Sequence, residues 1–379
     1  MQKKNKIVGA GIVLVILLIG IIVINNNSNN KYSFTQNGIK YALTLDGNKV
    51  TSFPSKGMYK AQVTCVGADG KWLYDEWKLA IENITSDNVT CDIKFSTITK
   101  TSLNDYIISL AGSTQGTGKV VNEKGYRYEG KNPNNYVWFN NEYWRIIGVF
   151  DSASHGQSGK NLVKIIRAEV LDGLTWHKSN TNDWTASSLK SLLNGAYYNA
   201  QDGTSSGYCY GYSTTATANC DYTKRGIQSG YRGMIASVTW HLGGYSRTSA
   251  TTSAFYGYER RTIVYSGRPT STTGYIGLMY PSDYGYSVLA SSCARTTLLD
   301  SYKSESCAGA SWIYGKGYEW TLTPSSSSSS DVFDLDSDGA VGNNNADSGA
   351  GSRPVLYLDA FVYKIDGDGS LKNPYIVGM

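Results

Sequence analysis

An apolar run near the amino terminus places the strongest constraint on this chain. Residues 7–24 (IVGAGIVLVILLIGIIVI) are 18 consecutive uncharged, apolar residues, long enough for a helix to cross the hydrocarbon core of a bilayer. Lys3, Lys4 and Lys6 precede the run, and the neutral segment NNNSNN follows it. Positive flanks stay in the cytoplasm. The pattern therefore predicts a cytoplasmic tail (1–6), a transmembrane signal anchor, and type II single-pass topology in the plasma membrane.

A cleaved signal peptide is the alternative to this anchor. Such peptides have a shorter apolar core and a cleavage site of the small-x-small type, and Val23, Ile24 and Asn25 provide no such site. We expect the helix to remain as the tether. Residues 25–30 are then a polar stalk, and all later residues are extracellular.

Six cysteines support an oxidising compartment, since an even number downstream of an export signal favours disulfides. The short spacings favour three bridges in series, although six cysteines allow 15 pairings and nested or crossed pairings stay open. The predicted pairs are Cys65 with Cys91, Cys209 with Cys220, and Cys293 with Cys307. The histidines, at positions 155, 177 and 241, lie far from the cysteines in sequence. We therefore expect no zinc site and no cofactor.

The charge balance bears on the partners. The net charge of +5 falls to +2 without the three amino-terminal lysines, because 32 basic residues then face 30 acidic ones. No basic patch typical of nucleic-acid binding follows from this composition. The expected partners are the membrane, through residues 7–24, and a glycan or a surface protein outside the cell.

Residues 31–98 show short alternating runs such as KYALTL, YKAQVTC and VTCDIKFSTI, separated by glycine-containing turns such as Asp46-Gly47. Period-2 runs broken every 8 to 12 residues predict a small all-β domain, a sandwich. Trp72 and Trp77 are expected to lie in its core or half-buried on its sheet.

Residues 99–125 are predicted to be a helix and a linker. Leu103, Ile107 and Leu110 recur at helical spacing, with Ser102 as the amino-terminal cap and a glycine at the end.

Residues 126–379 are predicted to form a larger, loop-rich α+β domain. The sequence predicts strands at 136–139, 142–150 and 162–168, with Asn140-Asn141 as a hairpin turn between the first two. It also predicts an amphipathic helix at 183–199, a helix around 231–241 and a strand around 274–279. Strands at the end of the chain flank a run of six serines (325–330), which we interpret as a loop inside the domain.

The order of YRYEGKNPNNYVWFNNEYWRIIGVFD, NLVKIIRAE, SSLKSLLN, EWTLTP and the terminal RPVLYLD resembles an uncharacterised family of exported, membrane-anchored bacterial surface proteins. The segments CVGADGKWLYDEWKLAIENI and CDIKF resemble the small disulfide-bonded β repeat of those proteins. The later domain is similar to a bacterial domain of unknown function related to the formylglycine-generating and C-type-lectin-like folds. The resemblance implies architecture and location.

The resemblance implies no functional residue. A formylglycine-generating enzyme needs reactive cysteines in its cleft, whereas Cys293 and Cys307 have the spacing of a structural pair. Calcium-dependent lectins of that fold carry Glu-Pro-Asn or Gln-Pro-Asp with Trp-Asn-Asp, and this sequence contains none of these motifs.

Two other groups of residues have types that could support chemistry. Asp334, Asp336 and Asp338 have the spacing of an EF-hand-like loop, but Asn345 stands where such a loop needs a glutamate. We predict a β-hairpin there and no metal site. Asp283 and His241 are residue types of a nucleophilic triad that also needs a serine, but no spacing supports such a triad because no GxSxG motif is present. No catalytic residue is predicted.

Tyrosine, glycine and serine are concentrated between about residues 208 and 320, a composition typical of binding loops. We predict one exposed aromatic face with two arginines at its edge, formed by Tyr256, Tyr258, Tyr280, Tyr284, Tyr286, Arg260 and Arg261. The alternative is that tyrosine is simply the surface hydrophobe of a loop-rich domain. The predicted function is recognition or adhesion at the cell surface. The alternatives are a cell-envelope hydrolase that uses carboxylates in the same cleft, or a structural surface component.

Overall fold

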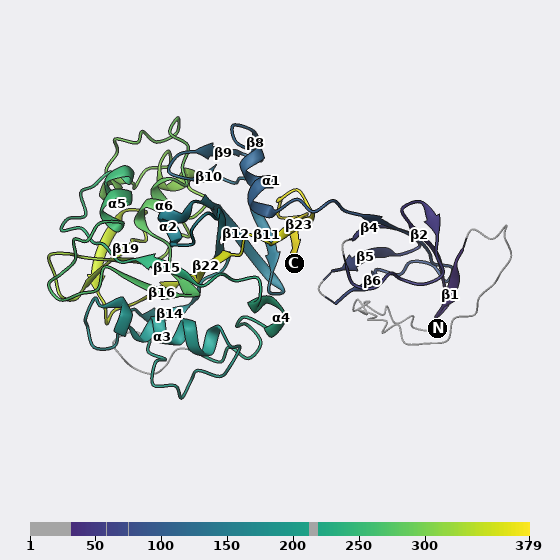
Figure 1. The fold of residues 1–379 in the computed structure, drawn as a ribbon, viewed down its shortest axis with the longest axis horizontal. Helices are drawn as coiled ribbons and strands as arrows, with labels where there is room; N and C mark the ends of the chain where they lie inside the picture. Colours follow the sequence, from purple (N-terminus) through teal and green to yellow (C-terminus); the bar gives the residue numbers. More distant parts are fainter. Residues whose placement is uncertain (1–31, 58, 75, 212–218) are drawn as a thin grey trace, which may run out of the picture. The chain divides into compact units, whose positions relative to one another are not determined.

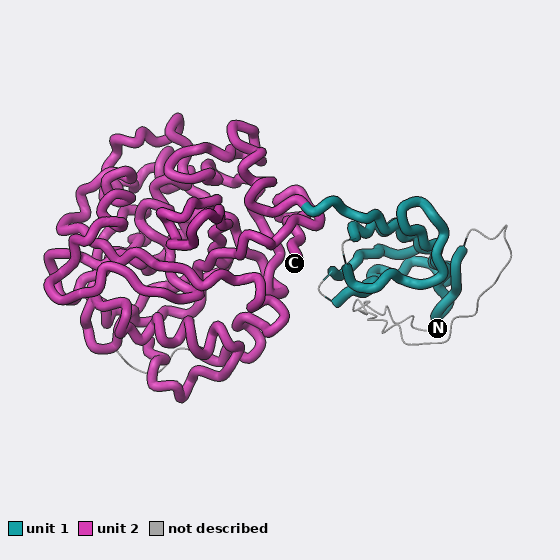
Figure 2. Tube along the Cα trace, in the orientation of Figure 1, with its two compact units in different colours: residues 1–100 teal, residues 101–379 magenta. Residues whose placement is uncertain are grey.

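The computed structural model describes residues 32–57, 59–74, 76–211 and 219–379 (Figure 1). The chain divides into two compact units, residues 1–100 and residues 101–379 (Figure 2). None of the helices in the described segments is long and apolar enough to cross a membrane. The predicted tail, anchor and stalk (1–6, 7–24 and 25–30) lie outside those segments.

The described part of residues 1–100 is built from strands. Five of them form a sheet with the path β1-β2-β7-β4, to which β3 is added beside β2, and β5 and β6 form a separate hairpin. Their bounds are β1 Phe34–Gln36, β2 Ile39–Leu45, β3 Asn48–Lys49, β4 Tyr59–Val66, β5 Asp69–Leu73, β6 Lys78–Glu82 and β7 Thr90–Thr97.

The turns of this unit follow from its glycines. Asp46 and Gly47 connect β2 to β3, and both have positive φ angles (49° and 81°). This geometry suits a two-residue hairpin turn, and glycine adopts it without steric cost. The sequence prediction of a small all-β unit is thus confirmed at the level of its strands.

The core of the small unit is aromatic. Trp72 of β5 is buried, and its ring meets those of Phe95 and Trp77 edge to face at 4.9 and 5.2 Å. Trp77 is half-buried, and its Nε1 donates to the carbonyl of Pro54 at 2.7 Å. Both tryptophans therefore lie where the sequence predicted. They join the β5–β6 hairpin to the sheet.

The larger unit contains a ten-stranded sheet. Its main path is β17-β22-β13-β12-β10-β9-β8, and β11, β24 and β23 extend it beside β12. The bounds are β8 Thr114–Gln115, β9 Gly118–Asn122, β10 Tyr126–Gly130, β11 Tyr136–Phe139, β12 Glu142–Phe150, β13 Leu162–Arg167, β17 Ile276–Gly277, β22 Val355–Leu358, β23 Tyr363–Asp366 and β24 Tyr375–Gly378.

A five-stranded sheet and a short ladder complete the strands of this unit. The sheet has the order β14-β21-β18-β19-β20, and β15 pairs with β16. The bounds are β14 Leu171–Thr175, β15 Val238–His241, β16 Ser271–Gly274, β18 Glu319–Pro324, β19 Asp331–Leu335, β20 Val341–Asn345 and β21 Gly349–Ser352.

The helices are short. They are α1 Leu103–Ser109, α2 Ser152–His155, η1 Trp184–Ala186, α3 Ser188–Leu192, η2 Leu193–Tyr197, α4 Ser229–Arg232, α5 Thr252–Glu259, α6 Pro281–Gly285, η4 Leu299–Ser301 and η5 Ala308–Ala310. Strand therefore dominates helix in the described part of the chain.

Several local predictions are confirmed in the larger unit. Phe139 pairs with Glu142 across Asn140 and Asn141, whose φ angles of 58° and 59° are those of a tight hairpin turn. Ser102 caps α1, because its side chain accepts a hydrogen bond from the backbone N–H of Asp105.

Other local predictions need correction. The helix expected at 183–199 is shorter than predicted: η2 directly continues α3, so residues 188–197 are helical, and the separate short turn η1 precedes them. Leu189, Leu192, Leu193 and Tyr197 are buried, as an amphipathic helix requires. The helix predicted around 231–241 is wrong, because only α4 is helical and β15 begins at Val238. Val238 and Trp240 are buried on one face of β15. Burial therefore repeats every two residues in this segment, as in a strand and not as in a helix.

The three predicted disulfides are confirmed. The Cα atoms are 4.1 Å apart in Cys65–Cys91, 6.0 Å in Cys209–Cys220 and 5.0 Å in Cys293–Cys307. Cys65 and Cys91 are directly opposite each other in the β4–β7 ladder. Each bridge closes a loop within its own unit.

Candidate functional site

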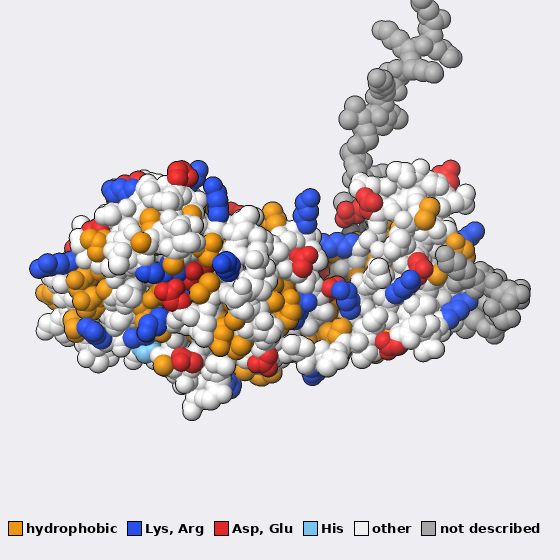
Figure 3. Space-filling view, turned by 90° about the horizontal axis from the view of Figure 1, so that it is seen from above, with side chains coloured by type: hydrophobic (Ala, Val, Ile, Leu, Met, Phe, Trp, Pro, Cys, Tyr) orange, Lys and Arg blue, Asp and Glu red, His pale blue; other side chains and the backbone are white. Residues whose placement is uncertain are grey.

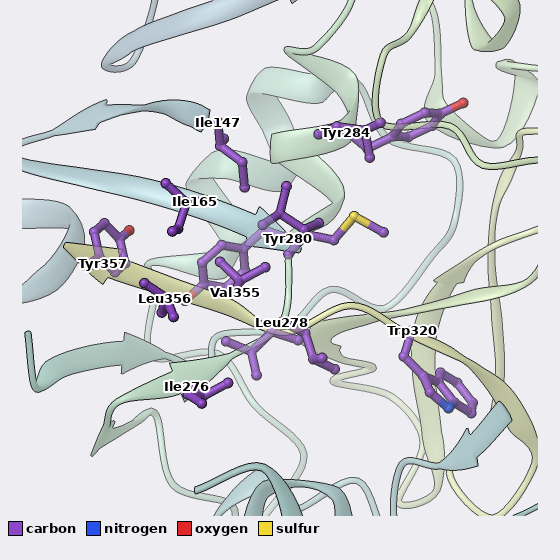
Figure 4. Packing of buried hydrophobic residues seen from close by; sticks show 14 of the residues in the cluster. Ile147, Ile165, Ile276, Leu278, Tyr280, Tyr284, Trp320, Val355, Leu356 and Tyr357 are labelled. Atoms are coloured by element: carbon purple, nitrogen blue, oxygen red, sulfur yellow. The ribbon is translucent and has the colours of Figure 1, made fainter. Parts of the chain in front are cut away.

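The structure does not bring the seven predicted binding residues onto one exposed face. Tyr280, Tyr284 and Tyr286 are only 1%, 0% and 2% exposed, so the prediction of an exposed aromatic face is wrong for them. In Figure 4, Tyr280 lies among Ile165, Val355 and other apolar side chains of the core.

These tyrosines are buried because they lie in or beside a helix, α6, in a segment whose composition predicted a loop. Pro281 is the first residue of α6, and the Asp283 carboxylate accepts a hydrogen bond from the backbone N–H of Tyr280 at 3.0 Å. Proline at the first position and an acidic residue at the third are helix-start signals. The tyrosines around α6 therefore point into the core.

The other predicted residues fall into two places. Tyr258 stacks on Tyr245 with ring centroids 4.0 Å apart, and the exposed Arg261 lies 5.1 Å from the Tyr258 ring. Tyr256 instead meets Tyr286 edge to face at 6.3 Å and Arg260 at 3.5 Å. Only Tyr256 and Arg260 combine partial exposure with contact to buried charges.

These buried charges form what we call the charged centre: Arg127 of β10, Lys164 of β13, Asp283 of α6, and Glu259 and Arg260 at the end of α5. Arg127 Nη1 donates to Asp283 Oδ1 at 3.0 Å, and Lys164 Nζ donates to Asp283 Oδ2 at 2.5 Å. Arg127, Lys164 and Asp283 are each only 1% exposed. Asp283 is thus a hub that joins two strands to α6.

Charge and burial compete at this hub. Burial alone would raise the pKa of Asp283, but Lys164 and Arg127 outweigh it and lower the pKa to about 2. Burial lowers the pKa of Lys164 to about 8, although Asp283 opposes that change. Both groups are therefore charged at neutral pH, and Asp283 needs both cations in place.

Glu259 and Arg260 form the second part of the charged centre. The Glu259 carboxylate accepts hydrogen bonds from Ser282 N at 2.9 Å, Ser282 Oγ at 2.5 Å and Arg260 Nη1 at 3.1 Å. Burial raises the pKa of Glu259, while Arg260 and Ser282 oppose this change. These bonds fix the end of α5 to the start of α6.

A separate set of charges lies next to Arg127. Arg295 bridges Glu123 and Glu129, with its Nη2 at 2.8 and 2.7 Å from the two carboxylates. Burial raises the pKa of Glu129 to about 8, although Arg295 opposes it. Glu129 is thus buried beside Arg295, whereas Glu123 is partly exposed.

Asp283 and His241 do not form part of a nucleophilic triad. Both oxygens of Asp283 are occupied by Arg127, Lys164 and the Tyr280 backbone N–H. The His241 ring bonds instead to the carbonyl of Ala153, at 3.0 Å from Nε2. This pair offers no arrangement for nucleophilic catalysis.

The acidic segment forms the predicted β-hairpin. Asp331 through Leu335 pair with Val341 through Asn345, which makes β19 and β20 a hairpin. Asp334 points inward, where Asn344 Nδ2 donates to its carboxylate at 2.6 Å, and burial raises its pKa to about 7. No cluster of three or more His, Cys, Asp or Glu side chains in the described segments is arranged to hold a metal ion.

Arg127, Lys164 and Glu259 were not predicted as site residues from the sequence. Lys164 interrupts the apolar run LVKII, and Arg127 alternates with tyrosines in YRYEG. A charged residue inside a strand with two buried faces needs a buried partner. That signal could have identified both cations, but not the partner, because Asp283 lies 119 residues from Lys164.

Searches with protein-family models, of curated proteins and of solved structures found no match for this chain.

Proposed function

We propose that this chain is a membrane-anchored bacterial surface protein, with residues 7–24 as its anchor and the later residues outside the cell. In this proposal residues 32–100 are a sandwich-like spacer. Residues 101–379 are a recognition module, with lectin-like architecture, for a glycan or a protein. The three disulfides are consistent with an exported chain.

The observation that carries the recognition proposal is a small surface site that we call the tyrosine–cation site, made of Tyr256, Arg260, Lys124 and, beneath them, Arg127. The Tyr256 ring is half-buried, and its centroid lies 3.5, 5.9 and 5.9 Å from Arg260 Cζ, Arg127 Cζ and Lys124 Nζ. Amphipathic rings beside cations are typical of recognition surfaces.

Rigid elements hold this site in position. Arg127 Nε donates to the carbonyls of Glu123 and Lys124 at 3.2 and 3.3 Å, which fixes the β9–β10 turn against its guanidinium. Arg260 Nη1 donates to the Tyr256 carbonyl at 3.2 Å. A preorganised site loses less conformational entropy on binding.

Charge over the wider surface supports a local site better than a broad electrostatic one. On the face in Figure 3, Lys and Arg side chains are interspersed with Asp and Glu side chains. Nonspecific binding to a polyanion favours a large single-sign patch instead.

The hydrolase alternative rests on the Glu123–Arg295–Glu129 bridge. Burial raises the pKa of Glu129, and a carboxyl group with a raised pKa can serve as a general acid. Glu129, however, is only 1% exposed, so a substrate would have to reach a covered carboxyl group.

The full-length protein in a neutral detergent should be applied to arrays of glycans and of matrix proteins. Saturable binding that Tyr256→Ala weakens, with an unchanged melting temperature, would support recognition at this site. Turnover of a glycan that Glu129→Gln abolishes would favour the hydrolase instead.

A further inference from the structure

The charged centre carries more positive than negative charge. Arg127, Lys164 and Arg260 face only two carboxylates, Asp283 and Glu259. The neighbouring Arg295 is bonded to two carboxyl groups of its own, those of Glu123 and Glu129. An uncompensated charge that is removed from water is costly unless a counter-charge binds beside it.

Two buried nitrogen atoms of the charged centre have no hydrogen-bond partner. Arg127 Nη2 and Arg260 Nε make no hydrogen bond to any described atom and are covered from solvent. Buried donors in folded proteins are nearly always bonded. Their guanidinium groups lie 5.9 and 3.5 Å from the centroid of the same Tyr256 ring, so one ligand near that ring can reach both.

The position of Tyr256 supplies a route to these atoms. Three rings lie around the Arg127 guanidinium: Phe150 at 4.6 Å, Tyr286 at 4.8 Å and Tyr256 at 5.9 Å. Phe150 and Tyr286 are buried, whereas Tyr256 borders solvent. The Arg260 side chain is 14% exposed, and Lys124 is exposed. Rotation of the Tyr256 side chain would open the charged centre to an incoming group.

We infer that the tyrosine–cation site binds an oxyanion, a carboxylate or phosphate carried by a surface glycan or polyol polymer, through Arg127 Nη2, Arg260 Nε and Lys124. This inference rests on the recognition function proposed above and specifies its ligand class. Guanidinium groups suit such oxyanions because their N–H donors can bind two oxygens at once. The neighbouring Tyr256 ring can stack on the sugar or polyol that carries the charge.

The test measures binding to full-length protein in a neutral detergent by calorimetry. The probes are tetragalacturonate, which carries carboxylates, a glycerol phosphate oligomer, which carries phosphates, and the uncharged galactotetraose. We expect saturable binding of at least one charged probe and none of galactotetraose. The two charged probes show which oxyanion the site prefers.

Two pairs of variants locate the site. Arg260→Gln should lower the affinity for the charged probe about tenfold, the effect of losing one charge-assisted hydrogen bond. Arg261→Gln, at the neighbouring position, should change this affinity less than twofold. Lys124→Gln should weaken binding measurably, and Lys119→Gln, in the adjacent strand β9 and also exposed, should not. If Arg260→Gln fails to fold, the comparison of Lys124→Gln with Lys119→Gln tests the site.

The outcomes separate the two proposals. Galactotetraose binding as tightly as the charged probes would overturn the oxyanion inference and leave glycan recognition standing. An equal loss of affinity in the two variants of each pair would show that the charged probe is attracted by the general surface charge, and would overturn the proposed site. Binding to a matrix protein with no affinity for any charged probe would also reject the oxyanion. Failure of every probe and every array member would overturn both.

Discussion

The two units differ in what they bury. In the described part of residues 1–100, the core is aromatic and aliphatic, and Ser33 is its one buried polar side chain. Residues 101–379 bury charged side chains as well, including Arg127, Lys164 and Asp283. Buried ion pairs contribute little net stability compared with apolar packing. The difference indicates that the described part of the small unit is held together by apolar packing, whereas the large unit combines apolar packing with buried ion pairs.

The largest expected effect follows from removing the hub of the charged centre. Asp283→Ala leaves Arg127 and Lys164 buried without their partner, which should destabilise residues 101–379 by about 3–5 kcal/mol. Urea unfolding followed by hydrogen exchange would assign the loss to one unit. Asp338→Ala is the matched control, because Asp338 pairs with Lys303 in an exposed position and should barely affect unfolding. A cost below about 1 kcal/mol would mean that the buried cations find other compensation.

The reciprocal change concerns the small unit. Replacing Cys65 and Cys91 together by serine removes a bridge across 26 residues, and the chain-entropy model gives a cost of about 3 kcal/mol. Hydrogen exchange should accelerate in residues 59–97 and stay unchanged in residues 101–379. Replacing Cys209 and Cys220 is the control, with its effect in the large unit. Faster exchange in both units after either change would show that the two cores are not independent.

A smaller effect distinguishes the units by pH. Burial raises the pKa of Glu129 from 4.5 to about 8, so the folded state binds more protons than the unfolded state between these values. The contribution of Glu129 to the free energy of unfolding is fully present below pH 4.5 and is lost as the pH rises through 8. The large unit should lose on the order of 2 kcal/mol between pH 5 and 8.

Chemical denaturation at several pH values measures this slope. Glu129→Gln should flatten it, although Asp334, whose pKa burial raises to about 7, adds a contribution of the same sign. Glu82→Gln, on the exposed end of β6, is the control. An unchanged slope in Glu129→Gln would assign the pH dependence elsewhere.

The same contrast explains what the sequence could predict. Asn140-Asn141, the Ser102 cap and the alternating strands of the small unit depend on neighbours in sequence, so each was predictable. The buried charges depend on contacts over long separations, since Arg127 and Asp283 are 156 residues apart. Helices α5 and α6 were missed because Gly257, Gly285 and several tyrosines gave them the composition of loops.

That composition misled the site prediction in a specific way. Arg261 is exposed, and Tyr256, Tyr258 and Arg260 are partly exposed. Tyr280, Tyr284 and Tyr286 are not, because α6 turns them toward the core. Tyrosine is amphipathic, so its abundance predicts either a binding face or a core with satisfied hydroxyl groups. Only the packing decides between the two.

The smallest expected effect compares a buried tyrosine with a partly exposed one. The buried Tyr284 hydroxyl donates to the carbonyl of Gly339 at 2.7 Å, so Tyr284→Phe should cost about 1 kcal/mol of unfolding free energy, because it leaves a buried acceptor with one bond fewer. Tyr256→Phe, at the surface, should leave stability unchanged. The two proteins differ from the parent by the same oxygen atom, and thermal unfolding of both measures the contrast. Equal stabilities would mean that Gly339 is satisfied without Tyr284, and that burial of this tyrosine owes nothing to its hydroxyl.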